Sequence, residues 1–141
     1  MNERENHSLL PHGDLTDRIL NCFFQTFGEL GHGFSELVLS RALEIVMTEA
    51  GLSVLREPEL DVQFHGHLIG RFRADLIVNR TVLIEVKGAA TLERYVESQV
   101  LNYLKACGGG VGLILNFGRK PEFKRLVMGD PTNSLPSLNR R

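Results

Sequence analysis

Two neighbouring segments in the middle of the chain alternate apolar and other residues with the period of a β-strand. In residues 73–78 (RADLIV) and residues 82–87 (VLIEVK), every second side chain is small or branched and apolar, as in strands with one buried face. Two strands pair in one of two parities, because a shift of one residue turns every side chain to the opposite face. Matching apolar with apolar places Leu76 opposite Ile84. The two segments therefore predict an antiparallel hairpin with a three-residue connection.

The same register gathers charged side chains on the other face of the hairpin. It places Asp75 opposite Glu85 and Arg73 opposite Lys87. Directly opposed Cβ atoms lie ~4.5–5.5 Å apart, so two carboxylates there repel each other. Burying them together is costly unless a cation lies between them. Mg²⁺, which binds oxygen ligands at ~2.0–2.1 Å, fits this gap.

Lys87 follows Glu85 on the same face, roughly 6.6 Å further along the strand. An ammonium at that position orients a water molecule or offsets charge that develops on a phosphoryl oxygen. The alternative is a solvated outer face, on which the two carboxylates pair with Arg73, Lys87 or Arg80.

A helix is predicted from Ser35 to Ala50, with Ser35 as its N-cap after two glycines. Extending its apolar stripe backwards with the same spacing reaches Glu36, and a carboxylate on a core-facing stripe is unusual. The alternative is a first-turn Glu that the helix dipole favours. The stripe itself consists of Leu39, Leu43, Val46 and Ala50.

A second helix is predicted from Leu92 to Cys107, and its proposed inward stripe includes an amide. The stripe consists of Leu92, Val96, Gln99, Tyr103 and Ala106. An inward Gln99 needs a hydrogen-bond partner, either within the core or at a functional site. Three inward polar groups placed independently around one hairpin favour a site.

The ordered set of motifs resembles the GxxExxY proteins of the PD-(D/E)XK nuclease-like superfamily, over roughly residues 14–127. The chain departs from the family pattern at Leu39, where GxxExxY has its Tyr, and at Ala74, which replaces the proline of the superfamily name. The matching stretches are GFSE (33–36), FRADLIV (72–78), VLIEVK (82–87), QVLNYLKA (99–106) and GLILNFG (112–118).

The resemblance implies metal-dependent cleavage of phosphodiester bonds in DNA or RNA, with Mg²⁺ or Mn²⁺ as the cofactor. The implied metal ligands are Asp75, Glu85, the Val86 carbonyl and Glu36, the last directly or through water. Lys87 resembles the catalytic lysine that positions the attacking water, and Gln99 the polar residue close to the scissile phosphate. Tyr103 is expected to pack in the core with its hydroxyl at the edge. The alternative is a non-catalytic nuclease fold that binds nucleic acid or protein.

Charge is distributed unevenly along the chain, although the net charge is only −1. Residues 1–70 hold 4 Lys+Arg and 11 Asp+Glu, whereas residues 71–141 hold 12 and 6. The basic second half predicts a surface that faces phosphate groups and a nucleic-acid partner. Its candidate residues are Arg71, Arg73, Lys105, Arg119, Lys120, Lys124 and Arg125.

The chain has 141 residues, of which 43% are hydrophobic and 23% charged, as expected for one globular domain. We expect a loosely packed segment at 1–13, a nuclease-like domain at 14–128 and a disordered tail at 129–141, rich in proline and polar residues. The element order αα-βββ-α-β, with a short further strand at 122–128, predicts an α/β fold: a restriction-endonuclease-like α/β sandwich with a central mixed sheet flanked by helices.

The two cysteines, Cys22 and Cys107, lack metal-ligand spacing, and no apolar run is long enough to span a bilayer. We therefore expect free thiols, no membrane association and a cytoplasmic location. Small nucleases of this fold often dimerise, so the resemblance also allows a homodimer.

Overall fold

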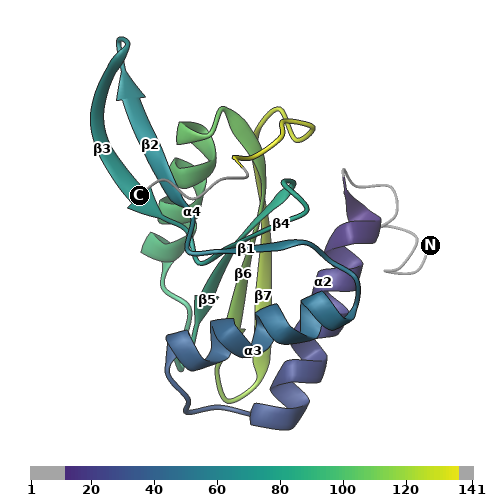
Figure 1. Ribbon diagram of the computed structural model, residues 1–141. Coiled ribbons are helices and arrows are strands. Elements are labelled where there is room, and N and C mark those ends of the chain that lie inside the picture. The colour runs from purple at the N-terminus through teal and green to yellow at the C-terminus, as the bar shows by residue number, and fades with distance from the viewer. Residues whose placement is uncertain (1–11, 137–141) are drawn as a thin grey trace, which may run out of the picture.

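A five-stranded mixed sheet lies at the centre of the protein (Figure 1). The computed structural model describes residues 12–136. In spatial order the strands are β1 (Val54–Arg56), β4 (Leu76–Val78), β5 (Val82–Lys87), β6 (Gly109–Phe117) and β7 (Pro121–Gly129). Only β5 and β6 run parallel; the other neighbours are antiparallel. The predicted α/β fold with a mixed sheet and flanking helices is confirmed.

Three helices cover the two faces of this sheet. Helices α2 (Gly13–Leu30) and α3 (Glu36–Glu49) pack on one face, and α4 (Arg94–Ala106) packs on the other. Alternation along β5 divides its side chains between the two cores, so that Ile84 faces α2 and α3 while Leu83 faces α4. By the same alternation Glu85 lies on the α4 side.

The predicted pairing between the two central segments is observed for residues 76–78 with residues 82–84 and ends there, since Arg73 pairs with Glu59 and does not lie opposite Lys87 as predicted. Leu76 is opposite Ile84 and Val78 is opposite Val82. Three residues connect the strands, and Asn79 adopts a positive φ of 51°, a conformation that Asn tolerates better than most residues. The carboxylate at position 75 and the carboxylate at position 85 therefore share a face.

Two segments that the residue pattern predicts as strands, 54–64 with an interruption at Pro58 and 68–78, are each divided between two sheets. The segment 54–64 breaks at Pro58, which cannot donate to a ladder, and the segment 68–78 breaks at Ala74 and Asp75. The outer pieces, β2 (Glu59–Phe64) and β3 (His67–Arg73), form a separate antiparallel hairpin. This β2–β3 hairpin projects away from the central sheet beside α4 (Figure 1).

The C-terminal part differs from its predicted form. Strand β7 is nine residues long rather than a short addition, and Gly109 and Gly110 belong to β6 rather than to a connector. Within the predicted tail, residues 130–136 are described and pack on the domain, whereas residues 137–141 lie outside the described part. Leu135 is fully buried, and its N–H donates to the Arg80 carbonyl at 2.7 Å. The apolar contacts of Leu135 hold this segment on the domain, although the residues around it are mostly polar.

The N-terminal boundary lies close to the predicted one, since α2 begins at Gly13; residues 1–11 lie outside the described range. Among the described residues, no helix has both the length and the apolar character needed to cross a membrane.

Candidate metal centre

Asp75 and Glu85 lie together at the point where β4 and β5 separate from their ladder. The last paired residues are Leu76 and Ile84, and beyond them the N–H of Val86 donates to Oδ2 of Asp75 at 2.7 Å. Asp75 and Glu85 also share a side-chain hydrogen bond. The predicted juxtaposition of the two carboxyl groups is therefore observed.

Glu85 is buried in a way that a solvated charged face does not explain. The residue is only 6% exposed, and its Oε2 atom has no hydrogen-bond partner among residues 12–136. Burial, followed by the hydrogen bond and the negative charge of Asp75, raises the pKa of Glu85 to about 9, although Lys87 opposes the shift. The alternative of a solvated outer face is wrong for this residue.

The donor set fits a hard divalent cation. Mg²⁺ is commonly held by one or two carboxylates and keeps several waters, and Asp75 and Glu85 supply two carboxyl groups, one with an unpartnered oxygen. Within residues 12–136, no three or more His, Cys, Asp and Glu side chains gather closely enough to hold an ion. The structure thus brings two carboxyl groups together at this place, and their role as metal ligands with the Val86 carbonyl stays a prediction.

Lys87 is half-buried at the end of β5, and its positive charge opposes the rise in the pKa of Glu85.

A buried amide that the sequence analysis did not single out holds the chain just beyond Lys87. Asn116, fully buried beside Lys87 in the parallel β5–β6 ladder, accepts from the N–H of Ala89 and donates to its carbonyl, both at 2.9 Å. The available signal was a lone amide within the apolar run 111–117. Asn116 therefore fixes the direction in which the chain leaves the Lys87 strand.

The loop before α3 lies close to the same end of β5 and β6. His32 Nδ1 lies 2.7 Å from the Phe117 carbonyl oxygen, and the Phe34 carbonyl lies 3.7 Å from the Cβ position that Gly88 leaves empty. Glu36 then opens α3 after the Ser35 cap, whose hydroxyl accepts from the N–H of Val38 at 3.3 Å. The predicted N-cap is confirmed.

Glu36 is exposed, not directed into the core as its stripe suggested, although its charge helps to raise the pKa of Glu85. Its predicted role at the metal, directly or through water, stays a proposal. The residues of α3 that are buried are Leu39, Ser40, Leu43 and Met47.

Gln99 and Tyr103 lie at the flank of α4 rather than on its buried stripe. The buried residues are Val96, Val100 and Leu104, so the predicted stripe was displaced by about one position. Gln99 Nε2 lies 2.7 Å from the Tyr103 hydroxyl. Burial raises the pKa of Tyr103, and the charges of Glu85 and Asp75 add to the rise. Both side chains are half-buried, and Tyr103 lies near enough to the carboxyl pair for those charges to act on it.

The predicted basic residues of the second half come from several elements. Arg71 and Arg73 lie on β3, Lys105 on α4, Arg119 and Lys120 at the β6–β7 turn, and Lys124 and Arg125 on β7. Arg71 pairs with Asp61 at 3.2 Å, and Lys124 pairs with Glu97 at 2.9 Å. The phosphate-facing surface stays a prediction.

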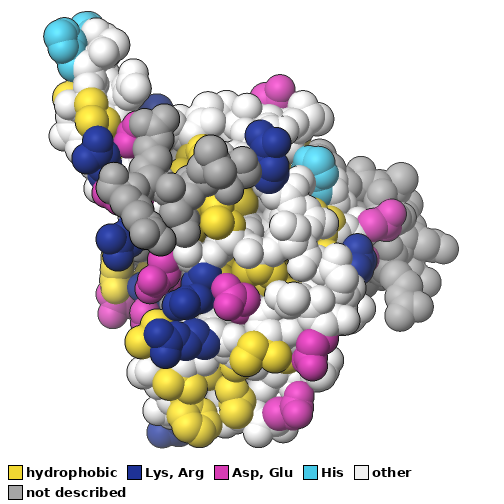
Figure 2. All heavy atoms as spheres, viewed as in Figure 1, with side chains coloured by type: hydrophobic (Ala, Val, Ile, Leu, Met, Phe, Trp, Pro, Cys, Tyr) yellow, Lys and Arg dark blue, Asp and Glu magenta, His cyan; other side chains and the backbone are white. Residues whose placement is uncertain are grey.

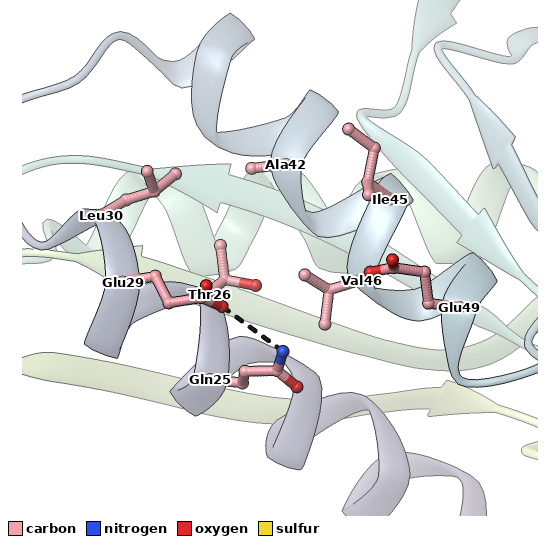
Figure 3. Close-up of a pocket in the computed structure, with 8 residues that line it drawn as sticks. All are labelled: Gln25, Thr26, Glu29, Leu30, Ala42, Ile45, Val46 and Glu49. Carbon is pink, nitrogen blue, oxygen red and sulfur yellow. Dashed lines mark hydrogen bonds between the residues drawn. The ribbon is translucent and has the colours of Figure 1, made fainter.

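A hollow of about 250 Å³ lies between α2 and α3 and contains none of the candidate site residues (Figure 3). Ala42, Ile45 and Val46 line its α3 side, while Gln25 donates to Glu29 at 3.4 Å on the α2 side. One wall of the hollow is apolar and its rim carries Glu29 and Glu49. Its lining does not include Asp75 or Glu85.

Comparison with known families identifies the group to which this arrangement belongs. The family model of the PD-(D/E)XK nuclease superfamily matches residues 13–126. The chain belongs to the PD-(D/E)XK nuclease superfamily. Members of this superfamily typically use divalent metals, which agrees with the fit of the Asp75–Glu85 pair to Mg²⁺. The narrower resemblance to the GxxExxY proteins stays a prediction.

A solved structure shares the fold of this chain. The crystal structure of SSO0001 is similar to this chain with a TM-score of 0.52 at 17% sequence identity, and the similar region covers 65% of this chain and 49% of SSO0001. The chain thus spans about half the length of that protein. No curated protein matches the chain.

Proposed function

We propose that this protein is a divalent-metal-dependent nuclease that hydrolyses phosphodiester bonds of nucleic acid. The observation that carries the proposal is the buried carboxyl pair, in which Glu85 Oε2 has no partner and the pKa of Glu85 is raised to about 9. A fold gains no stability from two carboxyl groups held this way, whereas a cation site requires them.

In this proposal Asp75, Glu85 and the Val86 carbonyl hold Mg²⁺ or Mn²⁺. A bound ion of this kind lowers the pKa of a coordinated water and neutralises charge on a phosphoryl oxygen. Lys87, next on the same face of β5, holds the attacking water by a hydrogen bond and offsets the negative charge that develops on the phosphoryl oxygens. Glu36 orients water from the exposed side.

Gln99 donates to the phosphate that is cleaved, with Tyr103 keeping the amide in place through their 2.7 Å hydrogen bond. Asn116 acts at one remove, since it positions the strand that carries Lys87 and touches no substrate. The roles of all these residues rest on their placement around the carboxyl pair.

The test is to incubate the purified protein with DNA and with RNA in the presence of Mg²⁺ or Mn²⁺. Cleavage by the parent protein, lost in Glu85→Ala and in Lys87→Ala, is the expected result. Arg41→Ala, at an exposed arginine on α3 outside the predicted phosphate-facing set, is the control and should cleave normally. Absence of cleavage by the parent, or full cleavage by both variants, would refute the proposal.

A second candidate function is a non-catalytic module that binds nucleic acid or protein. It is favoured by Leu39, which is fully buried in the core where the GxxExxY pattern has a tyrosine, and by the exposure of Glu36. Calorimetric titration with Mn²⁺ separates the two. A nuclease should bind Mn²⁺, and Asp75→Ala and Glu85→Ala should each abolish this binding, whereas a pure interaction module has no need to bind the ion.

A further inference from the structure

The β2–β3 hairpin packs on the α4 side of the core at its base, through Leu60 and Phe72, and carries exposed apolar side chains at its other end. Near its tip, Phe64 is 60% exposed and Ile69 is 62% exposed, and Leu68, which pairs with Gln63, is 47% exposed. Phe64 stacks on His65 with ring centroids 4.2 Å apart. Ordinary surface residues do not concentrate apolar area at the end of a projecting arm.

The tip is also free of carboxylates. Residues 62–70 contain no Asp or Glu and carry His65 and His67, while Arg71 and Arg73 follow on β3. Figure 2 shows histidine side chains at the end of the hairpin, with hydrophobic and then Lys or Arg side chains along it towards the body. Acidic side chains enter only nearer the base, where Asp61 pairs with Arg71.

The base of the hairpin is joined to the candidate metal centre. Strand β3 ends at Arg73, two residues before Asp75. The ring of Phe72 stacks on Tyr103 with centroids 4.0 Å apart and an interplanar angle of 10°, and Tyr103 is the partner of Gln99. The hairpin is therefore connected to the surroundings of the carboxyl pair in two ways, by the chain from β3 to Asp75 and by the stacking of Phe72 on Tyr103.

From this placement we propose that the hairpin is an arm that grips double-stranded nucleic acid beside the site of cleavage, with Phe64 and Ile69 as an apolar wedge in the groove. The inference deepens the proposed function and rests on it for the class of partner. A two-stranded ribbon fits a duplex groove, and apolar side chains that enter between base steps are a known means of holding a bent duplex. The carboxylate-free tip suits approach to phosphates.

The geometry sets the reach of the arm. Six residue steps from Arg73 to His67 span about 20 Å, which corresponds to roughly six base pairs of a duplex that runs along the hairpin. The wedge acts at that distance from the phosphate held by the carboxyl pair. A single strand offers no groove at this position and does not use the arm.

The experiment measures binding by fluorescence anisotropy in EDTA, with a labelled duplex of about 20 base pairs and with a single strand of the same length. Phe64→Ala combined with Ile69→Ala should weaken duplex binding roughly tenfold and leave single-strand binding unchanged. Ile45→Ala is the matched control, since Ile45 is 59% exposed on α3, and it should bind like the parent.

Equal duplex binding by the tip variant and the parent, or no duplex binding by the parent, overturns the inference. If the parent forms a dimer by light scattering and the tip variant is monomeric, the arm holds a second copy of the chain and the inference is also overturned. The binding assay contains no metal, so it tests the arm separately from cleavage. If the tip substitutions weaken binding but the protein never cleaves, the inference holds and the proposed function fails. If the protein cleaves but the tip substitutions leave binding unchanged, the proposed function holds and the inference fails.

Discussion

The N–H of Val86 donates to the carboxylate of Asp75 at 2.7 Å, and this hydrogen bond takes the place of the next rung of the β4–β5 ladder. A side chain thus replaces a backbone carbonyl where the two strands diverge. The replacement satisfies a buried N–H and holds Asp75 beside Glu85. The same opening directs β3 out of the central sheet into the hairpin.

Glu85→Gln should stabilise the metal-free protein. The pKa of Glu85 is raised from 4.5 to about 9, so between these values the folded state keeps a proton that the unfolded state has lost, and stability falls as pH rises. The amide needs no proton to remain neutral. We expect the free energy of unfolding at pH 8 to rise by at least about 1 kcal/mol, measured by urea denaturation across this pH range.

The matched control for that measurement is Glu49→Gln, at an exposed residue of α3. It should leave the pH dependence of unfolding as in the parent. A Glu85→Gln variant with the same pH dependence as the parent would show that Glu85 titrates normally.

Lys87→Ala should separate catalysis from metal binding. Because the ammonium is proposed to hold water and not the ion, Mn²⁺ affinity measured by calorimetry should change little. Cleavage measured in a single-turnover assay should fall by at least about 100-fold. Loss of Mn²⁺ binding with Lys87→Ala would mean that the lysine supports the carboxyl pair instead.

Asn116→Ala should free the chain that follows Lys87. Two hydrogen bonds of 2.9 Å to Ala89 are lost from a fully buried position, with a cost of about 1–3 kcal/mol. Hydrogen exchange of the Ala89 amide should accelerate specifically, and cleavage should fall at unchanged metal affinity. Asn102→Ala, at an exposed residue of α4, should alter none of these; unchanged Ala89 exchange in Asn116→Ala would contradict the positioning role.

Gly112→Ala should loosen the packing of α4 on the sheet. A Cβ at this residue would lie 2.8 Å from Val100 Cγ1 and 3.2 Å from Leu104 Cδ1, closer than packed atoms approach. We expect a loss of roughly 1–3 kcal/mol in thermal unfolding experiments. Gly28→Ala, in α2 with open space around the new methyl group, should instead be neutral or stabilising by up to about 1 kcal/mol.

Leu135→Ala tests whether the segment after β7 is part of the domain. Leu135 is fully buried against the α4 side of the core, so its truncation should cost about 2–5 kcal/mol. Leu37→Ala, at a leucine that is 46% exposed on α3, should cost much less. Equal unfolding midpoints for the two variants would show that the segment contributes no stability.

Sequence alone determined the local features of this protein: the three helices, the Ser35 cap, and the pairing of Leu76 with Ile84 that sets Asp75 beside Glu85. These follow from side-chain periodicity, which is a property of neighbours along the chain. The tertiary structure decided the division of two predicted strands between two sheets, the clamp from Asn116 to Ala89, the burial of Leu135 and the exposure of Glu36. Each depends on which surfaces meet in space, because the free energy of burial belongs to contacts between distant segments and leaves no period in the sequence.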